Sequence, residues 1–450
     1  MLATGCGPSG PKTTVVPDGT SVVFLTIDTL RQDHLGRSGH RRNTTPYLDR
    51  LAAESVYFTH AFAQSSWTLP SMLSMFSSLE PAIFGVTRGV APLDKPDKAG
   101  KLGVEEVVLE YFSNEYTTLT EVLNEAGFVT AGFSTNGHLR VEQGFAQGFA
   151  VFDQVTCTWE KAECVFEIAS DWLDEYVAVP RDRPFFLWIH LFDPHFDERH
   201  DGDLPSPLYT PARGDEELFA RPDETSLPLE ERTRIAYDRK IRHTDDQIAL
   251  FVEDLRERGL LDGSLFVVAA DHGEEFNEKG RWGHSKSLEN TLVRVPLLFR
   301  TPGGTAQAVV DAPVSNMDIA PTVLEFLGFD VPDAMRGTSL LSALRGEPLE
   351  PKVGYGETRR FEFDYRFRID PARNRKLVLD MHSGTRSLYS ITDDPSEKTD
   401  LAAIESHTAD AMERELRDEI VEMESRSASH TRRDSLSAEE IQHLRDLGYL

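Results

Sequence analysis

The sequence is poor in cysteine, in basic residues and in long apolar runs. Its 450 residues include only three cysteines, and 47 Lys and Arg stand against 75 Asp and Glu, a formal net charge of −28. No run approaches the ~18 consecutive apolar residues of a membrane-spanning helix, so we expect a soluble, globular chain. The excess of negative charge repels polyanions and excludes nucleic acid as a bulk partner. An anionic small substrate would need local positive charge, such as a metal ion.

One cysteine lies in a stretch that resembles part of an export signal. Cys6 ends Met1-Leu2-Ala3-Thr4-Gly5-Cys6, which resembles the end of a bacterial lipoprotein signal, where a small residue precedes a lipid-bearing cysteine. A lipid anchor at Cys6 would make residues 1–20 a tether. The protein would then be exported, at the membrane, in the periplasm or at the cell surface of a bacterium. The charged and apolar parts of such a signal are missing, so a chance match is the alternative.

The other two cysteines, Cys157 and Cys164, are close together in the sequence. As an even pair they form a local disulfide in an oxidising compartment. Two unrelated free thiols are the alternative.

Helical and strand-like stretches alternate along the chain, a pattern typical of a mostly parallel sheet covered by helices. The strand-like segments cover residues 22–27, 129–134, 185–189, 265–270 and 295–299. The helical segments cover residues 45–53, 118–126, 229–258 with a break near its start, and 318–327. We therefore expect one large α/β domain over residues 21–350.

Composition shifts near residue 350. Beyond this point, residues 376–379 and 387–391 alternate as short strands do, and the charged stretch 409–425 is helical. These segments predict a small antiparallel sheet with one helix, which would form a C-terminal subdomain over residues 351–450.

Side chains that bind metals or carry protons follow three of the predicted strands. Residues 22–27 lead into Asp28, residues 185–189 into His190, and residues 265–270 into Asp271-His272. In an open α/β sheet, ligands bind outside the carboxyl ends of parallel strands, so residues far apart in the sequence converge on one crevice. The sequence therefore predicts an active site at this edge of the sheet.

A series of motifs runs along the chain. They are Asp28-Thr29-Leu30-Arg31-Gln32-Asp33-His34-Leu35-Gly36, Thr45-Pro46-Tyr47-Leu48-Asp49-Arg50-Leu51-Ala52, Asp193-Pro194-His195, Asp271-His272-Gly273-Glu274, Gly283-His284, Asp318-Ile319-Ala320-Pro321-Thr322, Leu388-Tyr389, Asp394-Pro395, and Leu436-Ser437-Ala438-Glu439-Glu440 through Leu447-Gly448-Tyr449. On these motifs the chain resembles the sulfatases of the alkaline phosphatase superfamily, from about residue 21 to residue 450. The resemblance implies an alkaline phosphatase-like three-layer α/β sandwich with a large, mostly parallel central sheet. It also implies a small C-terminal α+β subdomain with an antiparallel sheet.

The sequence departs from the sulfatases at Thr68-Leu69-Pro70-Ser71-Met72. Sulfatases place a cysteine or serine here, followed by x-Pro-Ser-Arg, and oxidise it to formylglycine. A threonine cannot give that aldehyde because its β-carbon carries a methyl group, so we expect no formylglycine. A threonine nucleophile resembles the phosphoryl-transfer branch of the superfamily, and Pro70 would place Thr68 near the positive end of a helix dipole, where an anion is favoured. The alternative is that Thr68 only caps this helix.

The resemblance implies one bound divalent cation, with Asp28, Thr68, Asp271 and His272 as its ligands. Oxygen-rich ligation with one imidazole suits Mn²⁺, Mg²⁺ or Ca²⁺, and Zn²⁺ is also compatible. Coordination to a cation is one way to turn a threonine hydroxyl, a poor nucleophile near neutral pH, into an alkoxide. The other histidines do not follow the Asp-x-x-x-His spacing of two-metal members. A purely structural Asp271-His272 pair is the alternative.

By the same resemblance, His138, His195 and His284 contact the substrate. His138 takes the place of the sulfatase Lys-x-His motif, with Asn136 replacing the lysine, and His284 stands where many sulfatases have an active-site lysine or histidine. Because the unperturbed pKa of histidine lies near 6.5, these side chains can donate a proton to a leaving oxygen near neutral pH. His190 either flanks the leaving group or is a buried, hydrogen-bonded histidine.

Together these residues predict a metal-dependent hydrolase that cleaves sulfuric or phosphoric esters by attack of metal-bound Thr68. Phosphoester cleavage or phosphoryl transfer is favoured over sulfate ester hydrolysis. The substrate would be an anionic ester, either a sulfated or phosphorylated small molecule, a glycan or a lipid headgroup, and residues 88–116 and 195–227 would form the rim of its cleft. A catalytically silent, sulfatase-like surface protein is the alternative, because decay of an enzyme would also remove the formylglycine consensus. No sequence feature specifies an oligomeric state.

Overall fold

The computed structural model of the chain describes residues 19–93, 106–154, 162–179, 183–195, 226–350, 352–360, 362–427 and 432–435. Features of the sequence that lie wholly or mostly outside these residues are Cys6, the tether 1–20, Cys157, the rim segment 195–227 and the motif 436–449. Cys164 is disulfide-bonded, so its thiol is not free. Within the described ranges, no helix combines the length and the apolar character that crossing a bilayer requires.

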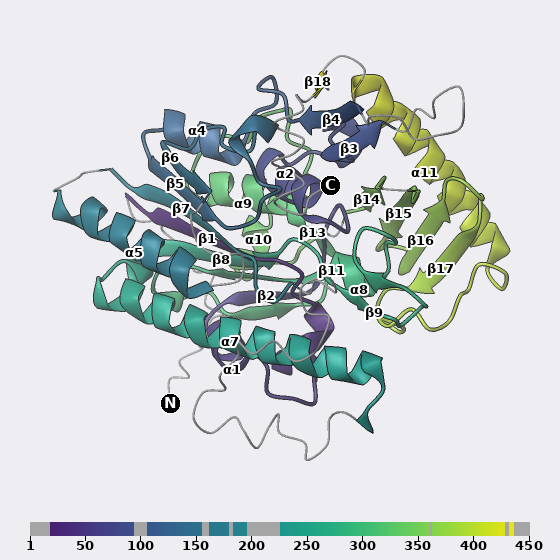
Figure 1. Cartoon of the computed structure of the whole chain (residues 1–450), viewed down its shortest axis with the longest axis horizontal. Coiled ribbons are helices and arrows are strands. Elements are labelled where there is room, and N and C mark those ends of the chain that lie inside the picture. The colour runs from purple at the N-terminus through teal and green to yellow at the C-terminus, as the bar shows by residue number, and fades with distance from the viewer. Residues whose placement is uncertain are drawn as a thin grey trace, which may run out of the picture.

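A nine-stranded sheet forms the centre of the molecule (Figure 1). Its path is β12-β2-β11-β8-β1-β7-β5-β6, and β13 pairs with β2. The strands are β1 (Ser21–Ile27), β2 (Val56–Phe62), β5 (Val129–Ser134), β6 (Val151–Gln154), β7 (Phe185–Leu191), β8 (Ser264–Ala270), β11 (Arg294–Arg300), β12 (Ala308–Val310) and β13 (Val314–Ser315). All described pairings in it are parallel except those of β11, which is antiparallel to β2 and β8. The mostly parallel α/β sandwich expected from the sequence is confirmed.

Helices cover both faces of the sheet, because its central strands are apolar on both sides. In β1, Val22 and Phe24 pack into one core while Val23 and Leu25 pack into the other. One face carries α1 (Pro46–Ala53), α5 (Ala162–Ala178) and α7 (Leu229–Glu257). The other carries α2 (Thr68–Ser77), α4 (Leu119–Glu125), α9 (Ile319–Phe326) and α10 (Leu341–Leu344) (Figure 1).

The break expected near the start of the long helix is wrong. The helix α7 runs without interruption from Leu229 to Glu257, over 29 residues. Its sequence contains no proline or glycine, the residues at which helices usually kink. Buried residues such as Ile235, Ile241 and Ile248 recur along its length, so one apolar stripe faces the sheet throughout.

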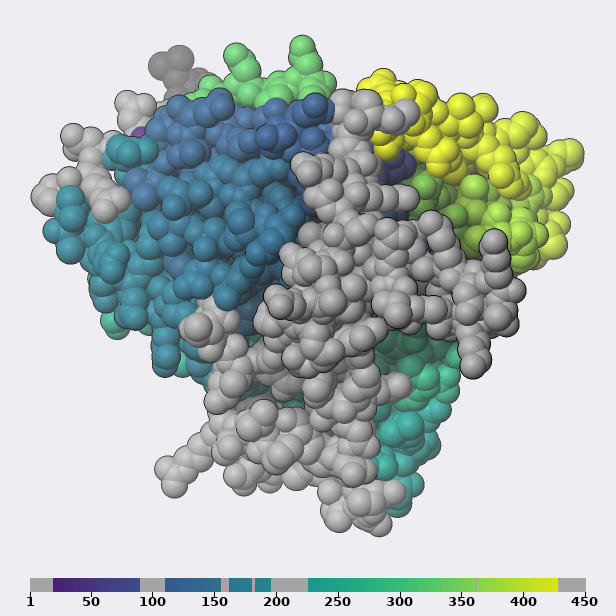
Figure 2. Space-filling view, turned by 45° about the horizontal axis from the view of Figure 1, so that its top comes forward, coloured from purple at the N-terminus to yellow at the C-terminus, as the bar shows by residue number. Residues whose placement is uncertain are grey.

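A second sheet and a helix form what we call the C-terminal unit. The four antiparallel strands β14 (Gly354–Thr358), β15 (Tyr365–Asp370), β16 (Arg375–Asp380) and β17 (Arg386–Ser390) lie beside α11 (Ser406–Ser427). Figure 2 shows this unit, in light green and yellow, at the opposite end of the molecule from α5. Leu377, Leu388 and Leu416 belong to the same apolar cluster as α2 and α9, so one core joins the unit to the main sheet. The boundary that we propose, near residue 350, falls between α10 and β14.

The remaining described elements are short and connect the larger ones. The strands are β3 (Val90–Leu93), β4 (Glu106–Tyr111) and β18 (Arg432–Ser435) in one sheet, and β9 (Glu275–Phe276) and β10 (Trp282–Gly283) in another. The helices are α3 (Pro81–Phe84), α8 (Asn290–Val293), η1 (Gln32–His34), η2 (Gly36–Ser38), η3 (Val141–Gln143), η5 (Leu261–Gly263), η6 (Pro302–Gly304) and η7 (Asn316–Asp318).

The first turn of α1 is held by a carboxylate from α7. Asp245 accepts hydrogen bonds from the backbone N–H groups of Tyr47 and Leu48, each at 2.7 Å. These N–H groups have no partner within their own helix. Burial raises the pKa of Asp245 to about 7. The Thr-Pro motif at the start of α1 therefore has a structural role, in which a helix N-terminus is joined to α7.

We predict that Asp245→Ala destabilises the fold by about 1–3 kcal/mol, because two buried N–H donors lose their acceptor. Chemical denaturation measures the change in the free energy of unfolding. Asp246→Ala is the matched control, since Asp246 is 32% exposed and pairs only with Arg242 on its own helix. Equal stabilities for the two variants would contradict this role.

Candidate active site

Two carboxylates lie next to each other where the central strands β1 and β8 end. These strands pair in parallel register up to their last residues, so Asp28 and Asp271 follow on adjacent strands, and both are fully buried (0% exposed). Burial and the charge of Asp28 raise the pKa of Asp271 to about 6. Burial alone would raise the pKa of Asp28 too, but its polar interaction with His190 and the charges of nearby histidines hold it below its usual range. Two buried carboxylates this close favour a cation between them.

His272 directs its Nε2 at this pair. Its Nδ1 lies 2.9 Å from the carbonyl oxygen of Gly273, which can only accept a hydrogen bond, so Nδ1 carries a proton. Nε2 faces Asp271 Oδ2 at 3.4 Å and Asp28 Oδ1 at 3.6 Å. Burial would lower the pKa of the ring, but the charges of these two carboxylates raise it, so a cation bound between them would take the place of a proton on Nε2. A histidine whose other nitrogen is fixed by a carbonyl is the usual form of a metal ligand.

His190, inside β7, presents a second such nitrogen. Its Nδ1 lies 2.9 Å from Thr26 Oγ1, and its Nε2 is buried without a hydrogen-bond partner, 3.6 Å from Asp28 Oδ2. Trp188 Nε1 donates to Thr26 Oγ1 at 3.1 Å, and Thr26 in turn donates to the backbone. His190 is therefore held on one side only, and its other side faces the carboxylates.

The hydroxyl of Thr68 lies among these groups. Thr68 Oγ1 is 3.3 Å from His272 Nε2 and accepts a hydrogen bond from Asn136 Nδ2 at 3.4 Å. Thr68 is the first residue of α2, while the capping position is taken by Trp67, and no side chain caps this end. The alternative in which Thr68 only caps the helix is therefore wrong. The open N-terminus of a ten-residue helix lies at this hydroxyl, where it favours an anion.

Three side chains fix Thr68 and its helix relative to the sheet. Ser71 Oγ donates to the backbone carbonyl of Asp271 at 2.5 Å. Asn136 Nδ2 donates to Asp28 Oδ2 at 2.6 Å as well as to Thr68. Met72, at the position of the sulfatase arginine, is buried in the apolar core. The helix is thereby aligned with the strand ends by polar contacts on one side and by apolar packing on the other.

The donor set fits a divalent cation. Asp28, His190 and Asp271 each offer a ligand atom, and these atoms lie within 4.8 Å of one another. The oxygens Asp28 Oδ1 and Asp271 Oδ2 and the nitrogen His190 Nε2 are all buried without a hydrogen-bond partner, although buried polar atoms are normally paired. A cation bound here would satisfy all three, with His272 Nε2 and Thr68 Oγ1 next to it.

A strained backbone segment follows Asp28 and contacts the second carboxylate, Asp271. Thr29 has φ of 55°, a left-handed conformation that is unfavourable for a β-branched residue. In this conformation its N–H donates to Asp271 Oδ1 at 3.1 Å and its carbonyl accepts from the hydroxyl of Tyr237 at 2.5 Å. The Tyr237 hydroxyl also accepts from the N–H of Arg31 at 3.0 Å. Tyr237 thus holds the loop that follows Asp28.

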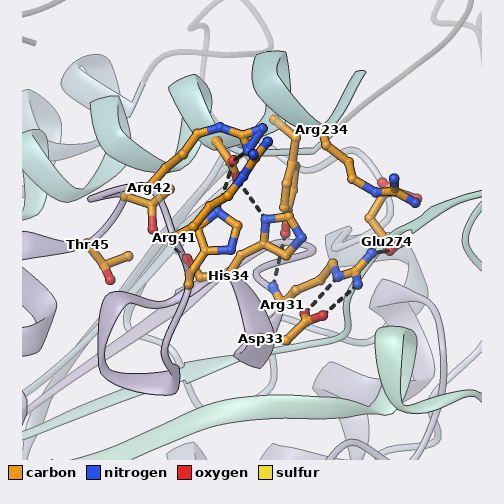
Figure 3. Close-up of polar contacts among 12 residues, drawn as sticks. Arg31, Asp33, His34, Arg41, Arg42, Thr45, Arg234 and Glu274 are labelled. Atoms are coloured by element: carbon orange, nitrogen blue, oxygen red, sulfur yellow. Dashed lines mark hydrogen bonds and ion pairs between the residues drawn. The ribbon is translucent and has the colours of Figure 1, made fainter. Parts of the chain in front are cut away.

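Arg31 joins the two loops that carry the carboxylates (Figure 3). Its guanidinium donates to Asp33 on one side and to the carbonyl of Glu274 at 2.9 Å and Glu278 Oε1 at 2.6 Å on the other. Burial would lower the pKa of Arg31, but the charges of Asp33 and Glu278 raise it above its usual range. The arginine of the first motif therefore positions the site and is not one of the groups that face the carboxylates.

A neighbouring group of histidines is structural. His34 Nδ1 lies 2.6 Å from Asp238 Oδ1, and His40 Nε2 and Arg42 Nη1 lie 3.0 and 2.9 Å from Asp238 Oδ2 (Figure 3). His34, His40 and Asp238 offer three ligand atoms that lie close enough together to hold a metal ion. However, the guanidinium of Arg42 already neutralises the carboxylate, which opposes a second cation. These contacts attach the loop after β1 to α7.

Three side chains, those of His284, Glu274 and His195, lie next to His272. His284 Nδ1 lies 3.1 Å from Oε1 of the buried Glu274, which orients the ring. The ring of His284 is 4.7 Å from that of His272 and 5.1 Å from that of His195. Burial lowers the pKa of His195 to about 4 and that of His284 well below its usual range, so both rings are neutral near pH 7. A bound anion would raise both values again.

His138 approaches from the other side, where its ring packs edge-on against Trp67 at 5.8 Å. Its backbone N–H donates to Asn136 Oδ1 at 2.9 Å, so the turn that contains Asn136 also places His138. The residues singled out in the sequence, Asp28, Thr68, His138, His195, Asp271, His272 and His284, come together at one edge of the sheet. Their individual roles stay predictions.

Four residues of the site carry only a weak signal in the sequence, or none. Asn136 was noted only as a replacement, and Glu274 only as part of a motif, although each contacts a candidate catalytic residue. The sequence signal for His190 is its position at the end of a predicted strand. Its Nε2, which has no hydrogen-bond partner, now favours His190 as a metal ligand. Tyr237 lies within α7 and has no sequence signal at all.

Two family models match the chain. The model "Sulfatase" matches residues 20–329, and the model "N-sulphoglucosamine sulphohydrolase, C-terminal" matches residues 278–426. The first alone covers well over half of the chain.

Several characterised relatives are similar at low identity. The ulvan-active sulfatase of Formosa agariphila is 24% identical over 73% of this chain and 66% of its own length. The arylsulfatase of Clostridium perfringens is 23% identical over 86% of this chain and 91% of its own length. The human N-sulphoglucosamine sulphohydrolase is 24% identical over 74% of this chain and 68% of its own length. The chain thus spans about two thirds of the length of two of these relatives.

Solved structures share the fold. A putative sulfatase from Bacteroides thetaiotaomicron superposes with a TM-score of 0.71 at 18% identity, covering 93% of this chain and 95% of the other. A phosphonate monoester hydrolase of Agrobacterium radiobacter superposes with a TM-score of 0.64 at 19% identity, covering 91% and 96%. The three-layer architecture and the C-terminal antiparallel sheet are therefore shared with both kinds of protein.

We predict that Tyr237→Phe weakens divalent-metal binding roughly 10- to 100-fold, because the Thr29 loop loses its outer support. Isothermal titration with Mn²⁺ gives the dissociation constant. Tyr116→Phe is the matched control, because it removes a similar bond to a backbone carbonyl, that of Ile83, away from the site. Equal metal affinity in both variants would show that Tyr237 does not position the ligands.

We also predict that metal affinity falls about tenfold for each pH unit below 6. Without metal the pKa of Asp271 is about 6, so a proton competes with the cation for this carboxylate below that pH and not above it. Titrations at pH 7.5, 6 and 5 measure the effect. An affinity that stays constant down to pH 5 would exclude Asp271 as a ligand.

Proposed function

Because the chain belongs to the sulfatase family of the alkaline phosphatase superfamily, we propose that it hydrolyses phosphoric or sulfuric esters with Thr68 as nucleophile and one divalent cation as cofactor. The observation that carries this proposal is the position of the Thr68 hydroxyl, at an open helix N-terminus and 3.3 Å from His272 Nε2. Next to it lie three buried ligand atoms without hydrogen-bond partners. This arrangement suits a reaction in which a hydroxyl attacks an anion beside a cation.

The proposed ligands are Asp28, Asp271, His272 and Thr68, to which the geometry adds His190. Mn²⁺, Mg²⁺ or Ca²⁺ suits the oxygen-rich part of this set, and two imidazoles make Zn²⁺ compatible as well. When bound, the cation would lower the pKa of the Thr68 hydroxyl and offset negative charge on the ester.

The chain's own residues would carry the other steps. The Thr68 hydroxyl loses its proton to solvent and Oγ1 attacks the phosphorus or sulfur atom. The bond between that atom and the leaving oxygen breaks, and the departing oxygen takes a proton from a histidine. His284 suits this donor role because Glu274 orients its ring, and an anionic ester raises its low pKa. The first N–H groups of α2 would bind the nonbridging oxygens, while Asn136 Nδ2 holds Asp28 and Thr68 in place. Water or an acceptor alcohol then cleaves the Thr68 ester.

Two observations favour phosphoryl over sulfuryl transfer. Threonine cannot become formylglycine, and the fold is shared with phosphonate monoester hydrolases as well as with sulfatases. Sulfate ester hydrolysis is the second candidate, because the similar curated proteins are named as sulfatases and one similar structure holds D-glucosamine-2-N,6-O-disulfate. Either substrate is an anionic ester.

A catalytically silent binding protein is less well supported. Loss of activity would release selection on the site, yet the carboxylates, the histidines and the contacts of Asn136 and Glu274 form one connected arrangement around Thr68. We also propose that the protein is exported and anchored by a lipid at Cys6. The disulfide at Cys164 supports an oxidising compartment.

We predict that Thr68→Ala reduces turnover at least about 10³-fold, because removing a covalent nucleophile leaves only binding and electrostatic effects. Thr68→Ser keeps a hydroxyl and retains part of the activity. Both variants and the wild type are assayed with Mn²⁺, Mg²⁺, Ca²⁺ and Zn²⁺ on four substrates, an aryl sulfate, a phosphate monoester, a phosphodiester and a phosphonate ester.

The outcome separates the alternatives. Thr68-dependent turnover of a phosphoester supports phosphoryl transfer, and Thr68-dependent turnover of the sulfate alone supports the second candidate. Full turnover by Thr68→Ala would refute the nucleophile. No turnover of any ester together with no bound metal would favour the binding protein.

A further inference from the structure

The first strand of the C-terminal unit is attached to both loops that carry reacting groups. The N–H of Glu357 in β14 donates to the carbonyl of Gln64 at 2.8 Å, four residues before Thr68. Thr358 Oγ1 donates to the carbonyl of Ser285 at 2.9 Å, the residue that follows His284. These contacts are buried and direct, so the end of β14 is fixed at the active site.

Arg360 lies two residues beyond β14, and the attachment of β14 places its side chain next to the active site. Its guanidinium carbon stands 4.2 Å above the ring of Trp67, which directly precedes Thr68 and is only 1% exposed. On its edge, Trp67 contacts the ring of His138. Stacking of a guanidinium on a tryptophan face is favourable and keeps the in-plane N–H groups directed away from the ring.

The charges of the site explain why a cation at the position of Arg360 matters for an anionic substrate. The guanidinium of Arg360 lies close enough to His138 and His284 for its charge to act on both rings. Asp28, Asp271 and Glu274 bring three carboxylates, which exceed the charge of one divalent cation. An anionic ester therefore meets an excess of negative charge unless a permanent cation lies nearby.

We propose that Arg360 is a substrate-binding residue, through which the C-terminal unit binds the nonbridging oxygens of the tetrahedral oxyanion that Thr68 attacks. This inference rests on the proposed function, since it concerns the same site. The planar guanidinium matches two oxygens of a phosphate or sulfate at once, which a lysine ammonium does not. The oxyanion would lie between the α2 N-terminus, the cation and Arg360, and the C-terminal unit would be part of the active site.

The test uses the full-length, metal-loaded protein and inorganic phosphate and sulfate as probes. We expect Arg360→Gln to raise the dissociation constant of both oxyanions roughly 10- to 100-fold, because a charged hydrogen-bond partner is lost. Arg360→Lys should give an intermediate value, since it keeps the charge without the bidentate geometry. Arg50→Gln is the matched control, because Arg50 also stacks on an aromatic ring, that of Tyr47, but on the exposed surface of α1.

Two further readouts separate binding from a structural effect. Titration with Mn²⁺ should give the same value for Arg360→Gln and wild type, because Arg360 is not a ligand, and thermal denaturation should show a loss similar to that of Arg50→Gln, because each variant loses one stacking contact. Unchanged oxyanion affinity in Arg360→Gln would overturn the inference, and so would a loss that Mn²⁺ affinity fully shares. Arg360-dependent oxyanion binding without any turnover of esters would contradict the proposed function alone.

Discussion

The structure depends on two buried carboxylates that neighbouring strands bring to one point. Asp28 and Asp271 follow directly on β1 and β8, so the parallel register leaves no freedom to separate them. Because both are buried, their mutual repulsion is costly unless a cation lies between them. The strained Thr29, the Tyr237 hydroxyl and the Arg31 guanidinium all act to hold the two loops against this repulsion. The fold thereby stabilises an arrangement that is unfavourable until a cation and an anionic substrate share it.

Much of the fold could be predicted from the sequence, because its central strands are continuous apolar runs. Strands such as 265–270 are buried on both faces, which leaves a strong signal, and the polar residue that follows each run marks the carboxyl edge of the sheet. The same reasoning failed at the start of α7, where we expected a break. That helix remains continuous because its buried isoleucines recur at helical spacing and no proline or glycine interrupts them.

The candidate site was only partly predictable, for a physical reason. Asp28, Asp271 and His272 were found because strand ends converge in any sheet of this kind. Asn136, Glu274 and Tyr237 contact site residues that lie 68, 10 and 208 positions away in the sequence, and such contacts leave no local pattern. Arg360 follows β14 of the C-terminal sheet, and the docking of β14 brings it to Trp67.

The central claim is that Thr68 forms a covalent bond with the transferred group beside a bound cation. Acid quenching of the Mn²⁺-loaded protein during turnover of an aryl phosphate, followed by peptide mass spectrometry, tests it most directly. The account predicts one phosphoryl group on the peptide that contains Thr68, absent from Thr68→Ala and from protein treated with a chelator. A phosphoryl group on another residue, or rapid turnover by the chelated protein, would contradict the account.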